Sequence, residues 1–181
     1  ILNAIKIKNS SLSNDLKFNI LKELSEEKKL SSKITLKKAQ INSKEIKKGD
    51  IFFTIKGKKN DGNKFISEAF NKKASIAVVN KISKNNNIKH QIKVRDSLKF
   101  LTQSSTVYRK NINTKIIAIT GSCGKTTLKE LLGNSLKKLS KTSTSPKSYN
   151  NKYGVPLSLF NLNQKDDYGV IEIGMDKKGE I

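Results

Sequence analysis

A strand, loop and helix pattern over residues 116–136 constrains this 181-residue chain more than any other feature. The Ile-rich residues 116–119 predict a buried strand, and Gly121 and Gly124 permit backbone conformations and close ligand approach that a β-carbon would hinder. The leucines at positions 128, 131, 132 and 136 then recur at helical spacing. A helix that begins beside the loop directs its free N–H groups and positive dipole end towards it. The segment therefore predicts a phosphate-binding loop.

Two side chains of this loop suit phosphate and metal chemistry. Lys125 supplies a mobile positive charge for β- and γ-phosphates, and the Thr126 hydroxyl follows where it can reach Mg²⁺. The common pattern G-x-x-x-x-G-K-[ST] is incomplete because Ile119 stands at its first glycine, which leaves a shorter T-G-x-x-G-K-T-T form. The alternative is an ordinary strand-turn-helix that contains Gly-Lys-Thr by chance. The expected phosphate cradle consists of Gly121, Ser122, Cys123, Gly124, Lys125, Thr126 and Thr127.

Glu172 is the second candidate, because it interrupts an apolar strand pattern between Ile171 and Ile173. A carboxylate buried in such a strand needs a partner or a metal ion. A phosphate-bound Mg²⁺ takes a small number of carboxylate and hydroxyl oxygens besides those of the nucleotide. Thr126 and Glu172 could supply that pair. The alternative is an exposed glutamate on an edge strand.

Strand and helix patterns alternate along the chain, which predicts an α/β fold with parallel strands. The short polar link at 110–114 is the expected boundary between domains over 1–112 and 113–181. Residues 140–148 are rich in Ser, Thr and Lys and are expected to form a loop. The other expected elements are helices over 15–24, 65–70, 96–109 with Asp96 as its cap, and 155–160, and strands over 51–55, 75–79, 91–94 and 168–174.

The formal charge of +22 raises nucleic acid as a possible partner. The basic residues are nearly all lysines spread along the chain, whereas arginine, the side chain best suited to bidentate contacts, occurs only at 95 and 109. We therefore expect nonspecific affinity for polyanions but no specific nucleic-acid binding. A single cysteine and the lack of a long apolar segment argue against a disulfide framework and a membrane span. The expectation is a monomeric, cytoplasmic protein.

Three motifs in order resemble the Mur ligase family, and shorter segments before them agree with that family's N-terminal domain. The resemblance extends from about residue 34 onward. Within the family it is most similar to the member that joins D-alanyl-D-alanine to UDP-N-acetylmuramoyl-tripeptide in peptidoglycan synthesis. The three motifs are Ile119-Thr-Gly-Ser-Cys-Gly-Lys-Thr-Thr127, Asn150-Asn-Lys-Tyr-Gly-Val-Pro-Leu157 and Ile171-Glu-Ile-Gly-Met-Asp-Lys-Lys-Gly-Glu-Ile181.

The resemblance implies a small α/β substrate domain followed by the start of a parallel-sheet ATPase domain, in an ATP-dependent ligase. A substrate carboxylate would take the γ-phosphoryl group of ATP as an acyl phosphate, and an amine would then displace phosphate. It implies a catalytic role for Lys125, Mg²⁺ ligation by Thr126 and Glu172, and positions near the nucleotide for Asn150 and Asn151. The UDP-sugar substrate is expected at Ser43, Lys44, Asn60 and Asp61.

The chain departs from the family pattern at three positions: Cys123 stands where the family commonly has Asn or another small residue, and Asn42 and Lys44 replace the usual Asp and Arg. Loss of the arginine removes a planar fork for bidentate contact with the nucleotide sugar. The resemblance places the family's modified lysine, further metal ligands and amine-binding domain beyond Ile181. We therefore expect residues 1–181 alone to bind parts of ATP and the UDP substrate without turnover. The alternatives are another Mur-type or folylpolyglutamate-like ligase, a noncatalytic nucleotide sensor, and a Lys-rich nucleic-acid-binding module.

Overall fold

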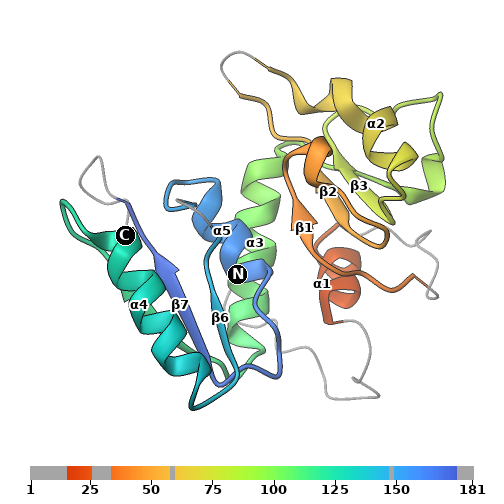
Figure 1. Cartoon of the computed structure of the whole chain (residues 1–181). Coiled ribbons are helices and arrows are strands. Elements are labelled where there is room, and N and C mark those ends of the chain that lie inside the picture. The colour runs from red at the N-terminus through yellow and green to blue at the C-terminus, as the bar shows by residue number, and fades with distance from the viewer. Residues whose placement is uncertain (1–15, 26–33, 58–59, 147–148, 175–181) are drawn as a thin grey trace. The chain divides into compact units, whose positions relative to one another are not determined.

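The chain forms two compact units, Ile1–Tyr108 and Arg109–Ile181, in a computed structural model (Figure 1). The structure describes residues 16–25, 34–57, 60–146 and 149–174. The division between the units falls inside helix α3 (Ser97–Lys110), whereas the sequence placed the domain boundary at 112. Residues 175–181 of the third family motif lie outside the described residues.

The first unit contains a four-stranded sheet in the order β1-β2-β3-β4, and all its neighbouring strands are parallel. Its helices are α1 (Leu16–Ser25), α2 (Ile66–Asn71) and α3. The predicted α/β architecture with parallel strands is confirmed. The strands are β1 (Ala39–Gln40), β2 (Ile51–Phe53), β3 (Ile76–Val79) and β4 (Gln91–Lys93).

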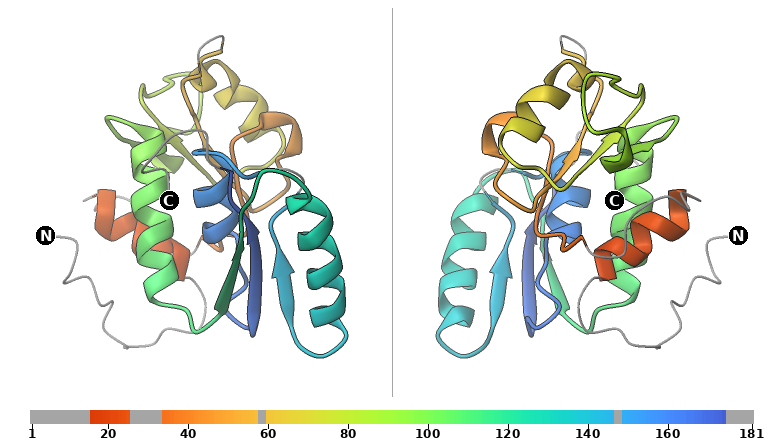
Figure 2. Two further views of the ribbon diagram at one scale, coloured as in Figure 1. Left: turned by 90° about the vertical axis from the view of Figure 1, so that its left-hand side faces the viewer. Right: turned by 90° about the vertical axis from the view of Figure 1, so that its right-hand side faces the viewer.

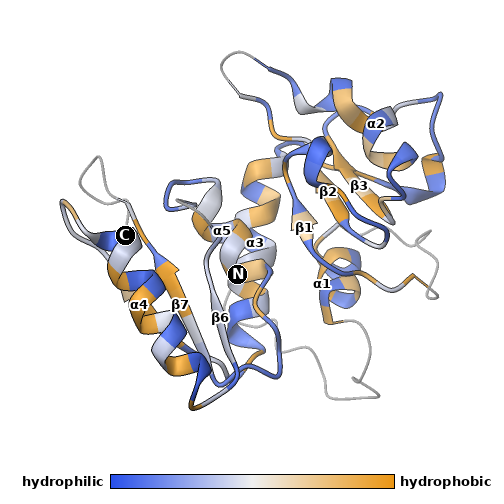
Figure 3. Cartoon of the chain, in the orientation of Figure 1, coloured by the Kyte–Doolittle hydropathy of each residue, from blue (hydrophilic) through white to orange (hydrophobic). Residues whose placement is uncertain are grey.

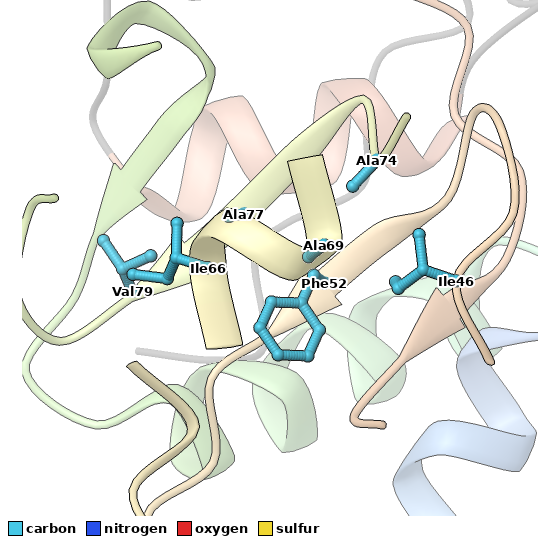
Figure 4. Packing of buried hydrophobic residues seen from close by; sticks show 7 residues of the cluster. All are labelled: Ile46, Phe52, Ile66, Ala69, Ala74, Ala77 and Val79. Atoms are coloured by element: carbon cyan, nitrogen blue, oxygen red, sulfur yellow. The ribbon is translucent and has the colours of Figure 1, made fainter. Parts of the chain in front are cut away.

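Hydrophobic residues cover both faces of this sheet. On one face, Phe52 and Ala77 pack in a buried cluster with Ile66 and Ala69 of α2 (Figure 4). Figure 4 shows α1 and α3 behind the strands, on the other face. Strands buried on both faces consist of continuous apolar runs, and this explains why the sequence predicted them. The fully buried residues at the alternate positions are Ile51, Phe53, Ile76 and Val78.

Helix α3 begins where its expected cap places it. The Asp96 Oδ1 atom accepts hydrogen bonds from the backbone N–H groups of Leu98 at 2.9 Å and Lys99 at 3.0 Å. These are donors that a helix cannot satisfy internally in its first turn. The predicted capping role of Asp96 is confirmed.

The second unit contains a three-stranded parallel sheet in the order β5-β7-β6. Helices α4 (Lys125–Lys137) and α5 (Gly154–Phe160) lie on opposite sides of this sheet (Figure 2). The predicted strand, loop and helix are present, with α4 beginning directly after the glycine-containing loop. The strands are β5 (Lys115–Ile119), β6 (Thr142–Thr144) and β7 (Tyr168–Glu172).

Strand β6 corrects the expectation that residues 140–148 form only a loop. Its Thr and Ser residues give no hydropathy signal, and β6 is nearly white in Figure 3 where β7 is orange. Tertiary contacts stabilise it instead: Thr144 pairs with Val170 of β7. Gly133 permits α4 to approach, because a β-carbon there would overlap the Thr144 Cγ2 atom.

The burial of β5 differs from the expectation of a buried strand, and no leucine is among the buried residues of α4. In β5 only Ile119 is buried, because this strand lies at an edge of the described sheet. In α4, Leu128 is 53% exposed and Leu131 63% exposed, whereas Lys129 and Gly133 are the buried residues. The helical spacing therefore predicted the helix but not the face that it turns inward. No helix in the described part of the chain has both the length and the hydrophobicity needed to cross a bilayer.

Candidate phosphate and metal site

The loop between β5 and α4 is open to solvent and shaped by two glycines. Gly121 has a φ of 144° and Gly124 a φ of 72°, a region that side chains with a β-carbon rarely adopt. A β-carbon on Gly124 would meet no atom within 4 Å, so its conformation rather than space requires glycine there. The first N–H groups of α4 have no partner within the helix and lie at this loop. The loop can therefore receive an anion.

The side chains of the loop lie around this opening. The Lys125 Nζ atom donates to the Gly121 carbonyl at 2.7 Å and to the Ser122 carbonyl at 3.4 Å. Its ammonium group is thus held over the loop, where phosphates would lie. The remaining predicted cradle residues, Ser122, Cys123, Thr126 and Thr127, are exposed.

Glu172 lies at the centre of a polar cluster beside the loop. It belongs to the central strand β7 and is only 1% exposed, so the alternative of an exposed glutamate on an edge strand is excluded. Its Oε2 atom accepts a hydrogen bond from Thr126 Oγ1 at 2.9 Å, and its Oε1 atom accepts one from Asn150 Nδ2 at 2.8 Å. The fold thus brings three of the predicted residues together from distant parts of the sequence.

The donor set of this cluster fits Mg²⁺. No group of three or more His, Cys, Asp or Glu side chains that could hold a metal occurs among the described residues. Mg²⁺ does not need such a group where phosphates are present, because it takes one or two carboxylates and completes its shell with phosphate and water oxygens. The Thr126 hydroxyl and the Glu172 carboxylate offer hard oxygen atoms of the kind that Mg²⁺ prefers, and these two atoms lie 2.9 Å apart.

The hydrogen bonds described for the Asn151 side chain hold the start of α5, whereas the side chain of Asn150 contacts Glu172. Its Oδ1 atom accepts hydrogen bonds from the N–H groups of Tyr153 and Gly154, both at 3.0 Å, at the start of α5. Asn150 is fixed separately, because its carbonyl accepts from Gly174 N at 2.6 Å. The adjacent asparagines therefore divide two tasks: Asn150 orients Glu172, and Asn151 caps the turn that holds Asn150.

Lys129 is a site residue that the sequence reasoning missed. Its side chain is fully buried, with Nζ 3.8 Å from Glu172 Oε2 and 3.2 Å from Glu130 Oε1. One signal could have found it: residues three and four apart share a helix face, and Lys129 follows Thr126 and Lys125 by those intervals.

In the first unit, Ser43 and Lys44 contact helix α2. The buried Ser43 hydroxyl donates to Glu68 Oε2 at 2.7 Å and lowers the pKa of that carboxyl group. The Lys44 carbonyl accepts from Lys72 Nζ at 2.9 Å. These contacts fix the short helical turn Ser43–Glu45 against α2, and leave the Lys44 side chain exposed.

Asn60 and Asp61 lie in the turn that precedes α2. The Asp61 Oδ1 atom accepts from the backbone N–H of Asn63 at 2.9 Å and from its side-chain amide at 2.8 Å, and both bonds lower the pKa of Asp61. The exposed Asn60 accepts from Gly57 N at 2.8 Å through its carbonyl. The contacts described for these residues stay within their own turn, so their role in substrate binding stays a prediction.

Cys123 offers a direct chemical probe of the loop, because it is the one cysteine of the sequence and is exposed. We expect N-ethylmaleimide to label it and to block ATP binding, because the adduct would fill the space for phosphates. Saturating Mg-ATP should slow labelling in proportion to the occupied fraction of the site. Mass spectrometry measures the labelling, and Cys123→Ser should bind ATP with or without the reagent. Labelling at an equal rate with and without Mg-ATP would contradict a nucleotide at this loop.

A parallel strand that leads through a glycine-containing loop into a helix, with a carboxylate on the next strand, defines the class of phosphate-binding-loop folds. A sequence model of the Mur ligase family catalytic domain matches residues 36–121, and one of the Mur ligase middle domain matches residues 119–180. The chain therefore belongs to the Mur ligase family.

Individual relatives agree with this family. The curated UDP-N-acetylmuramoyl-tripeptide–D-alanyl-D-alanine ligase of Buchnera aphidicola is 40% identical over 78% of this chain and 30% of its own length. A crystal structure of MurF from Acinetobacter baumannii matches 90% of this chain and 36% of its own, with a TM-score of 0.76 and 30% identity. The MurF ligase of Thermotoga maritima, solved in complex with ADP, matches 83% of this chain and 35% of its own, with a TM-score of 0.66 and 31% identity. The chain thus spans about a third of the length of these relatives.

Proposed function

We propose that this chain forms the ATP-binding and UDP-substrate-binding part of a ligase in peptidoglycan synthesis. The ligase would join D-alanyl-D-alanine to UDP-N-acetylmuramoyl-tripeptide. The observation that carries the proposal is the contact of Thr126 and Asn150 with the buried Glu172, beside an open loop that holds Lys125. The named activity of the Buchnera relative and the ADP in the Thermotoga structure support it.

The chemistry assigned to these residues is phosphoryl transfer followed by amide formation. A carboxylate oxygen of the tripeptide attacks the γ-phosphorus of ATP, the bond to the β–γ bridging oxygen breaks, and ADP leaves. The amine of D-alanyl-D-alanine then attacks the acyl carbon, loses a proton, and phosphate departs. Lys125 and the loop N–H groups offset the charge on the phosphates and hold them in line. Mg²⁺, held by Thr126 and Glu172, supplies further charge neutralisation when bound.

The two units take different parts in this proposal. The second unit binds ATP. The first unit binds the UDP end of UDP-N-acetylmuramoyl-tripeptide through Ser43, Lys44, Asn60 and Asp61. The monomeric state and the cytoplasmic location belong to the same proposal. The expected lack of turnover by residues 1–181 alone stays a prediction, and phosphate release that depends on D-alanyl-D-alanine would contradict it.

Calorimetric titration of the chain with ATP tests the nucleotide site. We expect Mg²⁺-dependent binding that Lys125→Ala weakens by roughly 10- to 100-fold, because charged hydrogen bonds contribute about 1.5–3 kcal/mol. Lys137→Ala is the matched control, because Lys137 is an exposed lysine near the end of the same helix. It should bind ATP as the parent chain does.

The same variants separate the proposal from a nucleic-acid-binding module. Such a module would bind DNA in a salt-sensitive way, and Lys125→Ala would leave this binding unchanged because many other lysines contribute. If the chain binds DNA tightly but shows no Mg²⁺-dependent ATP binding, the ligase proposal fails. Residues 1–181 alone are expected not to turn over, so the choice among ligases needs a longer protein that contains this chain. Dependence of its phosphate release on D-alanyl-D-alanine, and not on a single amino acid, would separate the proposed activity from other Mur-type enzymes.

A further inference from the structure

Lys129 is a charged group at the proposed metal site to which the proposed chemistry assigns no role. Its side chain is fully buried beneath α4, on the side that faces β7. Burying an ammonium group is costly unless an opposite charge compensates it. In this structure two carboxylates do so, Glu172 inside the unit and Glu130 at its surface.

The position of Lys129 relative to Thr126 matters for a cation. Both residues contact the same oxygen, Glu172 Oε2, with Thr126 Oγ1 at 2.9 Å and Lys129 Nζ at 3.8 Å. The other oxygen, Oε1, accepts from Asn150. A divalent cation between Thr126 and Glu172 would therefore share its carboxylate oxygen with an ammonium group already in place.

The charges of Lys129 and Glu172 imply that the site discriminates between a free divalent cation and a cation bound to a nucleotide. The carboxylate of Glu172 is compensated by Lys129 before any ligand arrives, so a free divalent cation gains little there and is repelled by the ammonium group. A cation carried by a triphosphate brings negative charge with it, and the same ammonium group then no longer opposes binding. The buried lysine thus favours the metal–nucleotide complex over the free metal.

We propose that Lys129 is a positioning residue that holds the Glu172 carboxylate beside Thr126 and makes binding of the divalent cation depend on the nucleotide. This inference rests on the proposed ATP site, and it adds a determinant of how that site is filled. The inference concerns residues of α4 and β7 alone, and its ligands are the metal ion and the nucleotide.

Mn²⁺ binding without nucleotide tests the inference in the full chain. Electron paramagnetic resonance of free Mn²⁺ gives the affinity for the parent chain and for Lys129→Gln, Lys129→Met and Lys137→Met. Glutamine can still donate a hydrogen bond to Glu172 but carries no charge, and methionine removes both. We expect both Lys129 variants to bind Mn²⁺ alone at least about tenfold more tightly, because the ammonium group 3.8 Å from Glu172 Oε2, which would repel the cation, is removed. The Lys137→Met control should match the parent.

A merely structural role would give the opposite result, because damage to the unit lowers metal and nucleotide affinity together. Unchanged or weaker Mn²⁺ binding by a folded Lys129 variant overturns the inference. So does failure of both Lys129 variants to fold, judged by circular dichroism, while Lys137→Met folds. Failure of the proposed function is distinguishable, because the parent chain would then lack Lys125-dependent binding of Mg-ATP whatever residue stands at 129.

Discussion

Replacing Glu172 with glutamine should remove the Mg²⁺ dependence of ATP binding and destabilise the second unit. The substitution keeps the size of the side chain but removes the charge that faces Thr126 and Lys129. Loss of the carboxylate ligand should weaken Mg-ATP binding at least about 100-fold, because metal coordination is worth several kcal/mol. It also leaves the buried Lys129 without its internal counter-charge, and breaking a buried pair costs about 3–5 kcal/mol. Calorimetry and chemical denaturation measure the two effects.

The matched control is Glu130→Gln, which removes the other carboxylate that contacts Lys129. Glu130 is 51% exposed, and an ion pair so accessible to water contributes less than about 1 kcal/mol. This variant should keep Mg²⁺-dependent ATP binding. Equal binding of Mg-ATP by Glu172→Gln and the parent chain would remove Glu172 from the metal site.

Gly154→Ala should be the most damaging single-methyl change near the site. A β-carbon at Gly154 would lie 2.5 Å from the carbonyl carbon of Tyr149 and 2.6 Å from its Cα atom. These are backbone atoms and cannot rotate away, so either the turn over residues 149–151 moves or α5 shifts. We expect a loss of more than about 3 kcal/mol in the free energy of unfolding. ATP affinity should fall as well, because the turn carries Asn150 and its contact with Glu172.

Gly57→Ala is the control for this prediction. The nearest atom to a β-carbon there is the Asn60 carbonyl oxygen at 3.5 Å, an ordinary contact, and the backbone of Gly57 does not lie in the left-handed region. Its cost should stay below about 1 kcal/mol. Urea denaturation of both variants makes the comparison, and equal stability of the two would show that the turn before α5 is not rigid.

The sequence predicted the elements that form because of their own residues and do not depend on contacts with distant parts of the chain. Strands β2 and β3 are buried on both faces and are therefore unbroken apolar runs, and Asp96 caps α3 through its own side chain. Strand β6 could not be predicted in this way, because its polar residues are held by pairing with β7 and by the small size of Gly133. These contacts come from residues outside β6, so the sequence of β6 itself does not indicate them.

The residues of the candidate site likewise fall into those that the sequence predicted and those that it did not. The loop and the pairing of Thr126 with Glu172 followed from motif chemistry, because a lone acid in an apolar strand and a hydroxyl after the loop lysine suit one metal. The helical spacing of the leucines predicted α4 but did not indicate its buried face, which carries Lys129 and Gly133. Lys129 was missed because hydropathy assigns lysine to the surface, whereas its burial here is compensated by carboxylates that include Glu172 of a distant strand.

The contact of Lys125 with its own loop has a consequence for how fast a ligand can enter. Its hydrogen bonds to the Gly121 and Ser122 carbonyls turn those oxygens, which would repel a phosphate, towards a positive charge. These two hydrogen bonds hold the loop in shape before a nucleotide binds, so the loop is preorganised. Binding then requires the rotation of one flexible side chain, a motion of picoseconds to nanoseconds, and no folding of the loop. Nucleotide association should therefore be limited by diffusion and orientation.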